Sequence, residues 1–512
     1  MNLNRVSGTL VLLLGFSCVG LFADTSGNEN SEGECTIGVA AGKATTDGRP
    51  LLWKTRDMTS SPDNEVYYNS TYGYVCVVSN PYYYEAWKGV NKHGFAICNS
   101  VITDFPVAST GEGNSAFMTS ALKYCKTVAD FQHCLDSTNG ARKTNACFGV
   151  MDSTGAAAIF ETSGFEYWKY DANDTSVAPD GFVVRTNFAF NCSLSIGYSE
   201  DRYYRSLALI QGFADGDSLC YRTVLRTQMR DFSNGFSVPF SVPFDSTLSG
   251  ARYGYIPTAV SICRSGSVSA TVFQGVLEGE NPRFSTMWTI LGQPAAGIAV
   301  PYWPVAKTCS LSYSSDSTAL LCNIDREIRK QLYDYSAMST YINTFKLFTH
   351  DSSRGLWTIT FPAEDSIFQA ADSILSVWRS GVPDSAQMQT TNADLAFYAY
   401  STLCRAYDTM VNFTTRINLP ELALAPPTLF SCYPNPANLS TRIRFYLPEK
   451  NRVRLEIYDI RGVKIRTLLN HYYNVGTHEV EYSPDEKTPS GVYVCLLRYG
   501  SSVKTENLIL LK

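Results

Sequence analysis

Two strand-like segments joined by a tight turn open the part of the chain that has a folding pattern. Residues 36–41 and 51–55 are rich in β-branched and apolar residues, and Asp47-Gly48 between them is a turn signal. A hairpin folded about this turn brings Cys35 level with Arg56-Asp57, with a register shift of several residues left open. The sequence therefore predicts that a thiol, a guanidinium and a carboxylate meet at the open end of a hairpin.

The segment before Cys35 has the composition of sequences that are removed during export. Asn4-Arg5 precede an apolar run over residues 9–22, so residues 1–23 are predicted to be a signal peptide. Residues 24–34 are rich in Gly, Ser, Asn and acidic residues without hydrophobic periodicity, which is typical of an exposed pro-segment. No later stretch approaches the roughly 20 continuous apolar residues of a membrane helix. We therefore expect an exported protein without a stable membrane span.

Cysteine usage leaves two interpretations of Cys35. The chain has 15 cysteines, and loss of Cys18 with the signal peptide leaves an even number, so Cys35 is either half of a disulfide or a free nucleophile. The wide cysteine spacing, the absence of CxxC and the length of the chain favour the free thiol. Cys98 and Cys147 lie in apolar strand-like runs, where buried reduced thiols are common.

The pattern of the chain divides it into a core, a helical segment and a tail. Residues 35–310 are predicted to form an α+β core, because strand-like segments and helical periodicity alternate in blocks. Residues 311–419 are predicted to be a helical extension, with a third helix from about Asp394. Residues 420–431 have the prolines of a linker. In residues 432–512 apolar and polar residues alternate, which indicates a small β-sandwich.

The charge of the chain argues against nucleic acid as a partner. The formal net charge is -5, and no long run of Lys and Arg occurs. Residues 432–512 hold 12 Lys and Arg and 8 Asp and Glu, a local charge of +4 that leaves -9 for the rest. This shift in composition supports a domain boundary before residue 432.

Motif spacing excludes several catalytic classes. The five histidines form no HExxH or His-Cys cluster, which disfavours a metal site. No histidine lies between His133 and His350, where a papain-like enzyme would carry its base. No GxSxG or phosphate-binding loop occurs, so no cofactor is expected. If the chain is cut between Glu34 and Cys35, the freed α-amine, with an ordinary pKa of about 8, supplies the base for the thiol.

Polar side chains near the ends of predicted strands complete this candidate site. Asn99 and Asn187 are candidate oxyanion donors, Asp57 is a candidate to orient the amine, and Arg56 is a candidate to stabilise the thiolate. Each has a structural alternative, because polar groups at strand ends are often only structural. Arg56 and Asp57 would then be an exposed ion pair, the asparagines turn caps, and Arg264 a solvated strand residue.

The start of the predicted core resembles a known family. It is similar to N-terminal nucleophile (Ntn) hydrolases of the acyl-CoA:6-aminopenicillanic acid acyltransferase (isopenicillin N acyltransferase-like) family, relatives of penicillin V acylases and bile-salt hydrolases. The likeness covers about residues 35–305. It is carried by Cys35-Thr36, Ala44-Thr45, Asp47-Gly48-Arg49-Pro50, Trp53-Lys54-Thr55-Arg56-Asp57, Gly89-Val90-Asn91-Lys92-His93-Gly94-Phe95, Val184-Arg185-Thr186-Asn187 and Ser261-Ile262-Cys263-Arg264.

This resemblance implies an αββα sandwich and an enzyme that hydrolyses or transfers acyl groups at amide bonds. It implies self-cleavage between Glu34 and Cys35, with Cys35 as the nucleophile. By motif position, Asp57 orients the freed amine, Arg56 supports the site and Asn187 is an oxyanion donor. No cofactor and no metal are implied, and the expected substrate is a small acylated amine or a short peptide.

Two further positions and two alternatives follow from the same comparison. Asn99 and Arg264 also match the pattern, although the spacing from Asn187 to Arg264 is longer than in bile-salt hydrolases. Secreted dipeptidases of a sister family also begin with Cys-Thr followed by a later Asp-Gly, so a dipeptidase is the alternative enzyme. A cell-surface binding protein on a decayed enzyme scaffold is the alternative from another class, favoured by the 32 tyrosines.

The tail has a resemblance of its own. It is similar to type IX secretion sorting domains of Bacteroidetes-like bacteria, on the segments Cys432-Tyr433-Pro434-Asn435-Pro436, Ile457-Tyr458-Asp459, Gly462 and Ser490-Gly491-Val492-Tyr493. This implies that the secretion machinery is a partner and that the protein is secreted or held at the cell surface. The alternative is an ordinary adhesive β-sandwich without a role in sorting.

Overall fold

The computed structural model describes the chain in several ranges. These are residues 34–80, 82, 85–191, 199–233, 254–314, 318–334, 339–348, 355–381, 384–413 and most of 430–510. The predicted signal peptide, residues 24–33 of the predicted pro-segment and residues 420–429 of the predicted linker lie outside the described residues.

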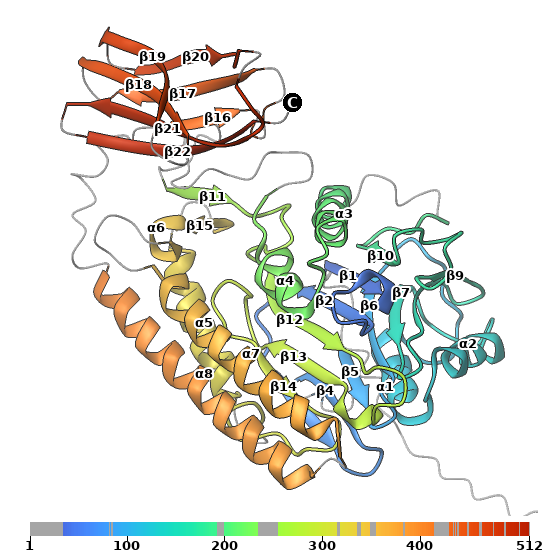
Figure 1. Cartoon of the computed structure of the whole chain (residues 1–512). Helices are drawn as coiled ribbons and strands as arrows, with labels where there is room; N and C mark the ends of the chain where they lie inside the picture. Colours follow the sequence, from blue (N-terminus) through green and yellow to red (C-terminus); the bar gives the residue numbers. More distant parts are fainter. Residues whose placement is uncertain are drawn as a thin grey trace, which may run out of the picture.

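The predicted hairpin forms the centre of a six-stranded antiparallel sheet (Figure 1). β1 (Cys35–Ala40) pairs with β2 (Leu51–Asp57), and Cys35 lies opposite Arg56. The predicted hairpin is therefore confirmed, and the structure supplies the register that the sequence left open. Gly48 in the turn has φ of 72°, a conformation that glycine adopts at little cost. The strand order is β10-β1-β2-β12-β13-β14, with β10 (Phe182–Arg185), β12 (Ser267–Gln274), β13 (Thr286–Ile290) and β14 (Val300–Tyr302).

A second, seven-stranded antiparallel sheet runs in chain order from β3 to β9. The predicted hairpins at residues 87–99 and 147–161 are both present in it. Its strands are β3 (Asn64–Asn69), β4 (Tyr74–Ser79), β5 (Lys88–Asn91), β6 (Ala96–Val101), β7 (Ala146–Met151), β8 (Ala157–Thr162) and β9 (Tyr167–Asp171).

The two sheets pack against each other and enclose the main hydrophobic core. Val39 and Leu52 point from the six-stranded sheet toward Gly149 of β7, where an added methyl group would lie 2.7 Å from Leu52 Cδ1. Because side chains alternate along a strand, Cys35 shares the inner face of β1 with Val39, and Arg56 shares the inner face of β2 with Leu52. The thiol therefore faces the space between the sheets.

Helices cover the outer faces of both sheets (Figure 1). α1 (Asn114–Tyr124) and α2 (Val128–Ser137) pack on the seven-stranded sheet, where Phe131 contacts Phe148 and Phe160. On the other side, Trp288 of β13 stacks on Tyr221 of α4 (Tyr221–Arg226) with ring centroids 4.6 Å apart. The predicted mixture of helices and strands is therefore confirmed for the described core.

The predicted helical extension supplies most of the outer layer on the six-stranded sheet. Its helices share one hydrophobic cluster with the sheets, through residues such as Ile328, Ala371 and Leu403. The last helix begins at Ser385, earlier than predicted, where Asp384 accepts a hydrogen bond from the Ala386 N–H and caps the helix. The sequence did not indicate this start, because the first turns of the helix carry no apolar pattern. The helices and small strands not yet given are α3 (Glu200–Asp215), α5 (Leu320–Leu332), α6 (Thr344–Leu347), α7 (Trp357–Trp378), α8 (Ser385–Phe413), β11 (Tyr255–Pro257) and β15 (Tyr341–Asn343).

The described residues between 430 and 510 form two β-sheets around a hydrophobic core of their own. Inward residues such as Ile443, Phe445, Val453 and Leu455 are fully buried in one cluster. One sheet has the order β16-β17-β20 and the other β19-β18-β21-β22. The strands are β16 (Phe430–Tyr433), β17 (Thr441–Leu447), β18 (Asn451–Asp459), β19 (Lys464–Tyr473), β20 (Gly476–Tyr482), β21 (Gly491–Tyr499) and β22 (Ser502–Leu510).

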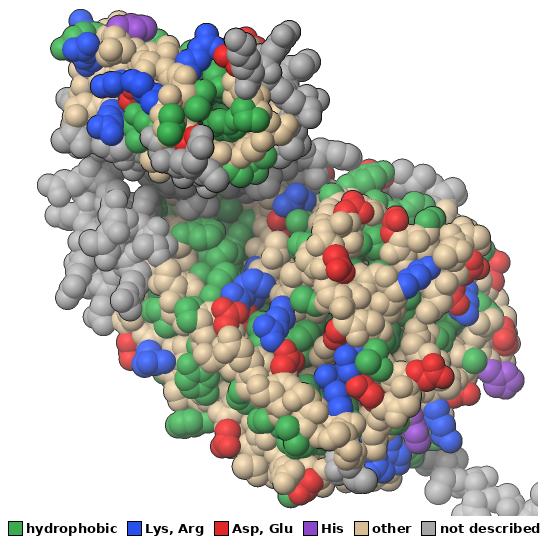
Figure 2. All heavy atoms as spheres, viewed as in Figure 1, with side chains coloured by type: hydrophobic (Ala, Val, Ile, Leu, Met, Phe, Trp, Pro, Cys, Tyr) green, Lys and Arg blue, Asp and Glu red, His purple; other side chains and the backbone are tan. Residues whose placement is uncertain are grey.

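Basic and acidic side chains are interspersed over the face of the core drawn in Figure 2. Within the described ranges, no helix combines the length and the apolar character needed to cross a membrane.

The α1–α2 connection carries a pair of neighbouring thiols. Cys125, which follows α1, and Cys134, which lies in α2, have their sulfurs 3.7 Å apart, and the hydrogen bond between the two thiols lowers the pKa of the Cys134 thiol. We expect this pair to form a disulfide under oxidising conditions, stabilising the fold by about 2 to 3 kcal/mol for so short a loop. Non-reducing mass spectrometry should find a peptide pair that lacks two hydrogens, with the solitary buried Cys76 as the control that stays reduced. Two free thiols after oxidation would contradict this expectation.

Candidate active site around Cys35

The peptide bond between Glu34 and Cys35 is fixed at both ends. The Cys35 backbone nitrogen donates a hydrogen bond to Asn187 Oδ1 at 2.7 Å. The Glu34 carbonyl oxygen accepts one from the Asp57 N–H at 2.8 Å. The Cys35 carbonyl oxygen accepts a third from Arg202 Nη1 at 2.7 Å. With only 4% of Cys35 exposed, the predicted cleavage point is an ordered, nearly buried bond.

Arg56 and Lys54 project from β2 on the same face as the Cys35 side chain. Arg56 Nη1 donates to Asn64 Oδ1 at 2.8 Å, which anchors it to the seven-stranded sheet. Lys54 Nζ donates to Asn99 Oδ1 at 2.6 Å. Burial lowers the pKa of the Lys54 amine, and it lowers that of Arg56 to about 10. Both cations interact electrostatically with Cys35.

Lys88 is the third basic side chain at this end of the core. It lies opposite Cys98 at the start of β5 and is fully buried. Its Nζ makes no hydrogen bond to any residue that the structure describes. Burial holds the pKa of this amine well below its usual value, and Lys54 and Arg56 lower it further. Lys88 is therefore an amine that exchanges its proton more readily than an exposed lysine.

Asp57 lies on the opposite face of β2 from Arg56. Its Oδ1 accepts a hydrogen bond from Ser267 Oγ at 2.6 Å, and its Oδ2 lies 3.9 Å from Arg202 Nη1. Burial raises the pKa of the Asp57 carboxyl to about 6, and the Arg202 charge opposes this shift. Asp57 thus reaches Cys35 through the Arg202 guanidinium and through its own backbone N–H.

The predicted site residues converge on one end of the core. Cys35, Arg56, Asp57 and Asn187 are joined by the contacts above, and Asn99 is joined to them by Lys54. Asn99 lies within β6 and is 2% exposed, so its alternative as a turn cap is wrong. Arg264 lies in the loop before β12, where its Nη1 contacts the Glu34 carboxylate. Its alternative as a solvated strand residue is also wrong.

Arg202 is the residue that the sequence did not reveal. It lies in α3, and its side chain is 1% exposed. Besides Cys35, it contacts Asn187 Oδ1 at 3.1 Å and the Glu34 carboxylate at 2.8 Å. Apolar residues at helical spacing, Tyr203, Leu207 and Ile210, mark the helix. Nothing in the sequence pattern links Arg202 to a strand 167 positions away.

The described part of the chain contains neither a disulfide nor a cluster of metal ligands. Every cysteine that the structure describes is free, including Cys35, and the predicted burial of Cys98 and Cys147 is confirmed. Over the same described ranges, no three His, Cys, Asp or Glu side chains come together as metal ligands.

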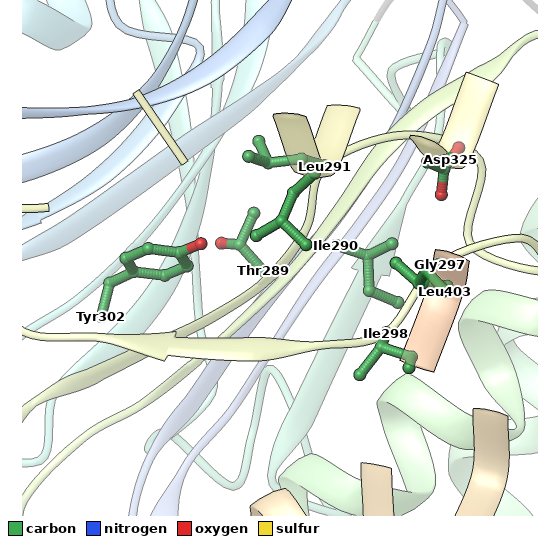
Figure 3. Close-up of a pocket in the computed structure, with 9 residues that line it drawn as sticks. Thr289, Ile290, Leu291, Gly297, Ile298, Tyr302, Asp325 and Leu403 are labelled. Carbon is green, nitrogen blue, oxygen red and sulfur yellow. The ribbon is translucent and has the colours of Figure 1, made fainter. Parts of the chain in front are cut away.

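A small cavity lies away from this site, beside β13 and β14 (Figure 3). Its lining is mostly apolar, with Ile290, Ile298 and Leu403, and Asp325 stands at its edge. Asp325 Oδ1 accepts a hydrogen bond from the Gln293 N–H at 2.7 Å, and burial raises the pKa of this carboxyl well above its usual value. The cavity shares no lining residue with the Cys35 site and belongs to the packing of α5 and α8.

Three solved structures are similar to parts of this chain. Dimeric latent PorU from Porphyromonas gingivalis matches at 19% identity and a TM-score of 0.15, over 17% of this chain and 10% of that one. A mutant of conjugated bile acid hydrolase from Clostridium perfringens matches at 10% identity and a TM-score of 0.30, over 50% of this chain and 89% of that one. A second variant of that hydrolase matches at 11% identity and 0.29, with the same coverage. Scores this low leave the function to be inferred from the geometry around Cys35.

The tail matches a family of known role. The search among curated proteins found no match to the chain. Residues 431–511 match the family model described as "Secretion system C-terminal sorting domain". The tail is therefore a type IX sorting domain, which implies interaction with the secretion machinery, and the protein is exported to the cell surface or secreted.

Proposed function

We propose that this protein is an exported amide hydrolase or acyltransferase of the Ntn type, with the thiol of Cys35 as nucleophile. The chain frees this residue by cutting its own bond between Glu34 and Cys35. The main support for this proposal is the set of hydrogen bonds on the peptide bond between Glu34 and Cys35. The Asp57 N–H donates to the Glu34 carbonyl and polarises it, and Asn187 Oδ1 accepts a hydrogen bond from the Cys35 nitrogen. Lys54 and Arg56 project from β2 on the side of the thiol and interact electrostatically with Cys35.

Self-cleavage needs a base other than the Cys35 nitrogen, because that nitrogen is still an amide. Burial lowers the pKa of the Lys54 and Lys88 amines, so either can accept the thiol proton. Cys35 Sγ then bonds to the Glu34 carbonyl carbon, and the oxyanion is held by the Asp57 N–H. The carbon–nitrogen bond breaks as the nitrogen takes up a proton. Water hydrolyses the thioester and releases the pro-segment.

External amides follow the same path once the α-amine is free. The amine replaces the lysines as the base for the thiol, and Asn187 Oδ1 orients it. Asn187 Nδ2 donates to the Val101 carbonyl at 3.0 Å, while Asn99 is held through its oxygen by Lys54. Asn99 therefore presents its amide nitrogen to the oxyanion of the substrate. Water or an amine then accepts the acyl group from Cys35.

The buried carboxyl of Asp57 predicts how cleavage depends on pH. Its pKa is raised to about 6, and only the ionised form pairs with Arg202, so the rate of self-cleavage should rise as the pH passes through about 6. Stability should move the opposite way. A raised carboxyl pKa favours the fold at low pH and costs about 3 kcal/mol once the pH exceeds the folded pKa.

Asp57→Asn should flatten both curves, and Asp63→Asn, in an exposed ion pair with Arg326, is the control. Rates of cleavage from purified uncut chain, with urea unfolding of the Cys35→Ala chain across the same pH values, give the measurement. A cleavage rate that falls through pH 6 would count against the role of Asp57.

A substrate panel tests the proposed activity. Purified protein should hydrolyse some members of a set of acylated amines, penicillins, bile-salt conjugates and dipeptides, and an added amine acceptor should reveal any acyl transfer. Turnover of dipeptides alone would favour the secreted dipeptidase. No turnover, with Cys35 no more reactive toward a thiol label than the buried Cys76, would favour the binding protein.

A further inference from the structure

The carboxylate of Glu34 is held by two arginines that come from distant parts of the chain. Arg202 Nη2 of α3 donates to Glu34 Oε2 at 2.8 Å, and Arg264 Nη1 from the loop before β12 contacts the same oxygen. The pairs are 168 and 230 positions apart in sequence. This two-arginine clamp therefore binds a side chain that leaves with the pro-segment in the proposed self-cleavage.

Departure of Glu34 leaves the clamp without its carboxylate. The Arg264 side chain is 20% exposed, and burial lowers the pKa of its guanidinium. Its Nε has no hydrogen-bond partner among the residues that the structure describes, and its Nη1 contacts the carboxylate of Glu34. A half-buried guanidinium that loses its carboxylate favours binding of another anion.

The chemistry of self-cleavage gives the position of this anion relative to the bond that is cut. When Cys35 Sγ displaces the Cys35 nitrogen, Glu34 becomes the acyl group of the thioester. An external amide forms the same kind of thioester, with its own acyl group on Sγ and its amine released. The clamp therefore lies on the acyl side of the bond. In Glu34 the carboxylate carbon is four bonds from the carbonyl carbon.

We infer that the mature enzyme prefers amides whose acyl group carries a carboxylate four bonds from the scissile carbonyl. Glutaryl, α-glutamyl and γ-glutamyl amides have this spacing. This inference rests on the proposed function and adds the substrate class to it. Arg202 and Arg264 are then specificity-determining as well as positioning residues.

Matched substrates test the inference on the self-cleaved full-length protein. N-glutaryl-4-nitroanilide should have a kcat/KM at least about tenfold above that of its uncharged 5-amino-5-oxopentanoyl counterpart, as expected for charge-assisted hydrogen bonds. Succinyl and adipyl anilides, with three and five bonds, should be poorer than glutaryl. Glutarate should inhibit competitively, and pentanoate should inhibit less.

Variants assign the preference to the clamp. Arg264→Gln should lower the ratio of the two kcat/KM values toward one, and Arg264→Lys should retain part of it. Arg222→Gln, which alters a half-exposed arginine–carboxylate pair with Asp372, should leave the ratio unchanged. If Arg264→Gln fails to fold or to cut itself, the chain-length series and glutarate inhibition of the wild type still decide.

The outcomes separate this inference from the proposed function. Equal or faster turnover of the uncharged anilide by a protein that begins at Cys35 would overturn the carboxylate preference and leave the amidase standing. A protein whose bond between Glu34 and Cys35 stays intact, with no anilide turned over, would overturn the proposed function itself.

Discussion

Replacing Cys35 with alanine is expected to give a folded, full-length chain that neither cuts itself nor turns over amides. The alanine removes the only atom that forms the proposed thioester, so turnover should fall at least about 10⁴-fold, as when other enzymes lose their nucleophile. Loss of the sulfur should cost little stability. Cys35 is the first residue of β1, and its replacement by alanine leaves the backbone pairing of the hairpin unchanged. Intact mass and an amide hydrolysis assay on the same preparation give the measurement.

The control for this experiment is another buried strand cysteine. Cys76→Ala alters a thiol in β4 that packs toward α1 and α2 rather than toward the cleavage point, and it should cleave and turn over normally. Cys35→Ser retains an oxygen nucleophile and should cleave slowly. A Cys35→Ala chain that still appears cut before residue 35 would mean that another protease removes the pro-segment.

Replacing Arg202 with methionine is expected to have the second largest effect. Arg202 contacts the Cys35 carbonyl, the Glu34 carboxylate, Asn187 and Asp57 from a nearly buried position. Its loss leaves buried acceptors and a carboxylate without their cation, which costs about 3 to 5 kcal/mol of stability. The held peptide bond also loses its support, so self-cleavage should slow by about 100-fold or more.

A second arginine of the same helix is the matched control. Arg205 pairs with Asp231 and touches none of the groups around Cys35, so Arg205→Met should lower stability by a smaller amount and leave the cleavage rate near that of the wild type. Arg202→Lys keeps the charge without the fork of donors and should fall between the two. Urea unfolding and a time course of cleavage separate the effects. A normal rate of self-cleavage in Arg202→Met would contradict the proposed role of Arg202 in supporting the peptide bond that is cut.

Local patterns carry most of the information about the fold. The turn signal at Asp47-Gly48 and the strand-like segments on either side of it predicted the hairpin and placed Cys35 near Arg56-Asp57. The exact register stayed open, because residues 41–50, which join the two strands, are too many to fix it. The predicted start of α8 was too late in the sequence. The helix begins after the cap at Asp384, and its polar first turn gives no apolar periodicity from which the start could be predicted. In the tail, the segments of β17 and β18 could be recognised because their alternate residues, such as Ile443 and Leu455, are buried in one core.

Long-range contacts explain what the sequence left out. Lys54 was visible two positions before Arg56, and strand alternation places the two on one face. Lys88 lay inside a predicted strand, but only the packing of the two sheets brings its amine to the cleavage point. Arg202 and the clamp on Glu34 depend on a helix and a loop that meet β1 only in the folded chain.

The N-terminal residue of the exported protein tests the central claim most directly. Protein recovered from outside the cell, shown to be active on an amide, should begin at Cys35 by N-terminal sequencing. The purified, uncut chain should reach the same end point without added protease. Active protein in which the bond between Glu34 and Cys35 is intact would contradict the claim that Cys35 works as a freed N-terminal nucleophile.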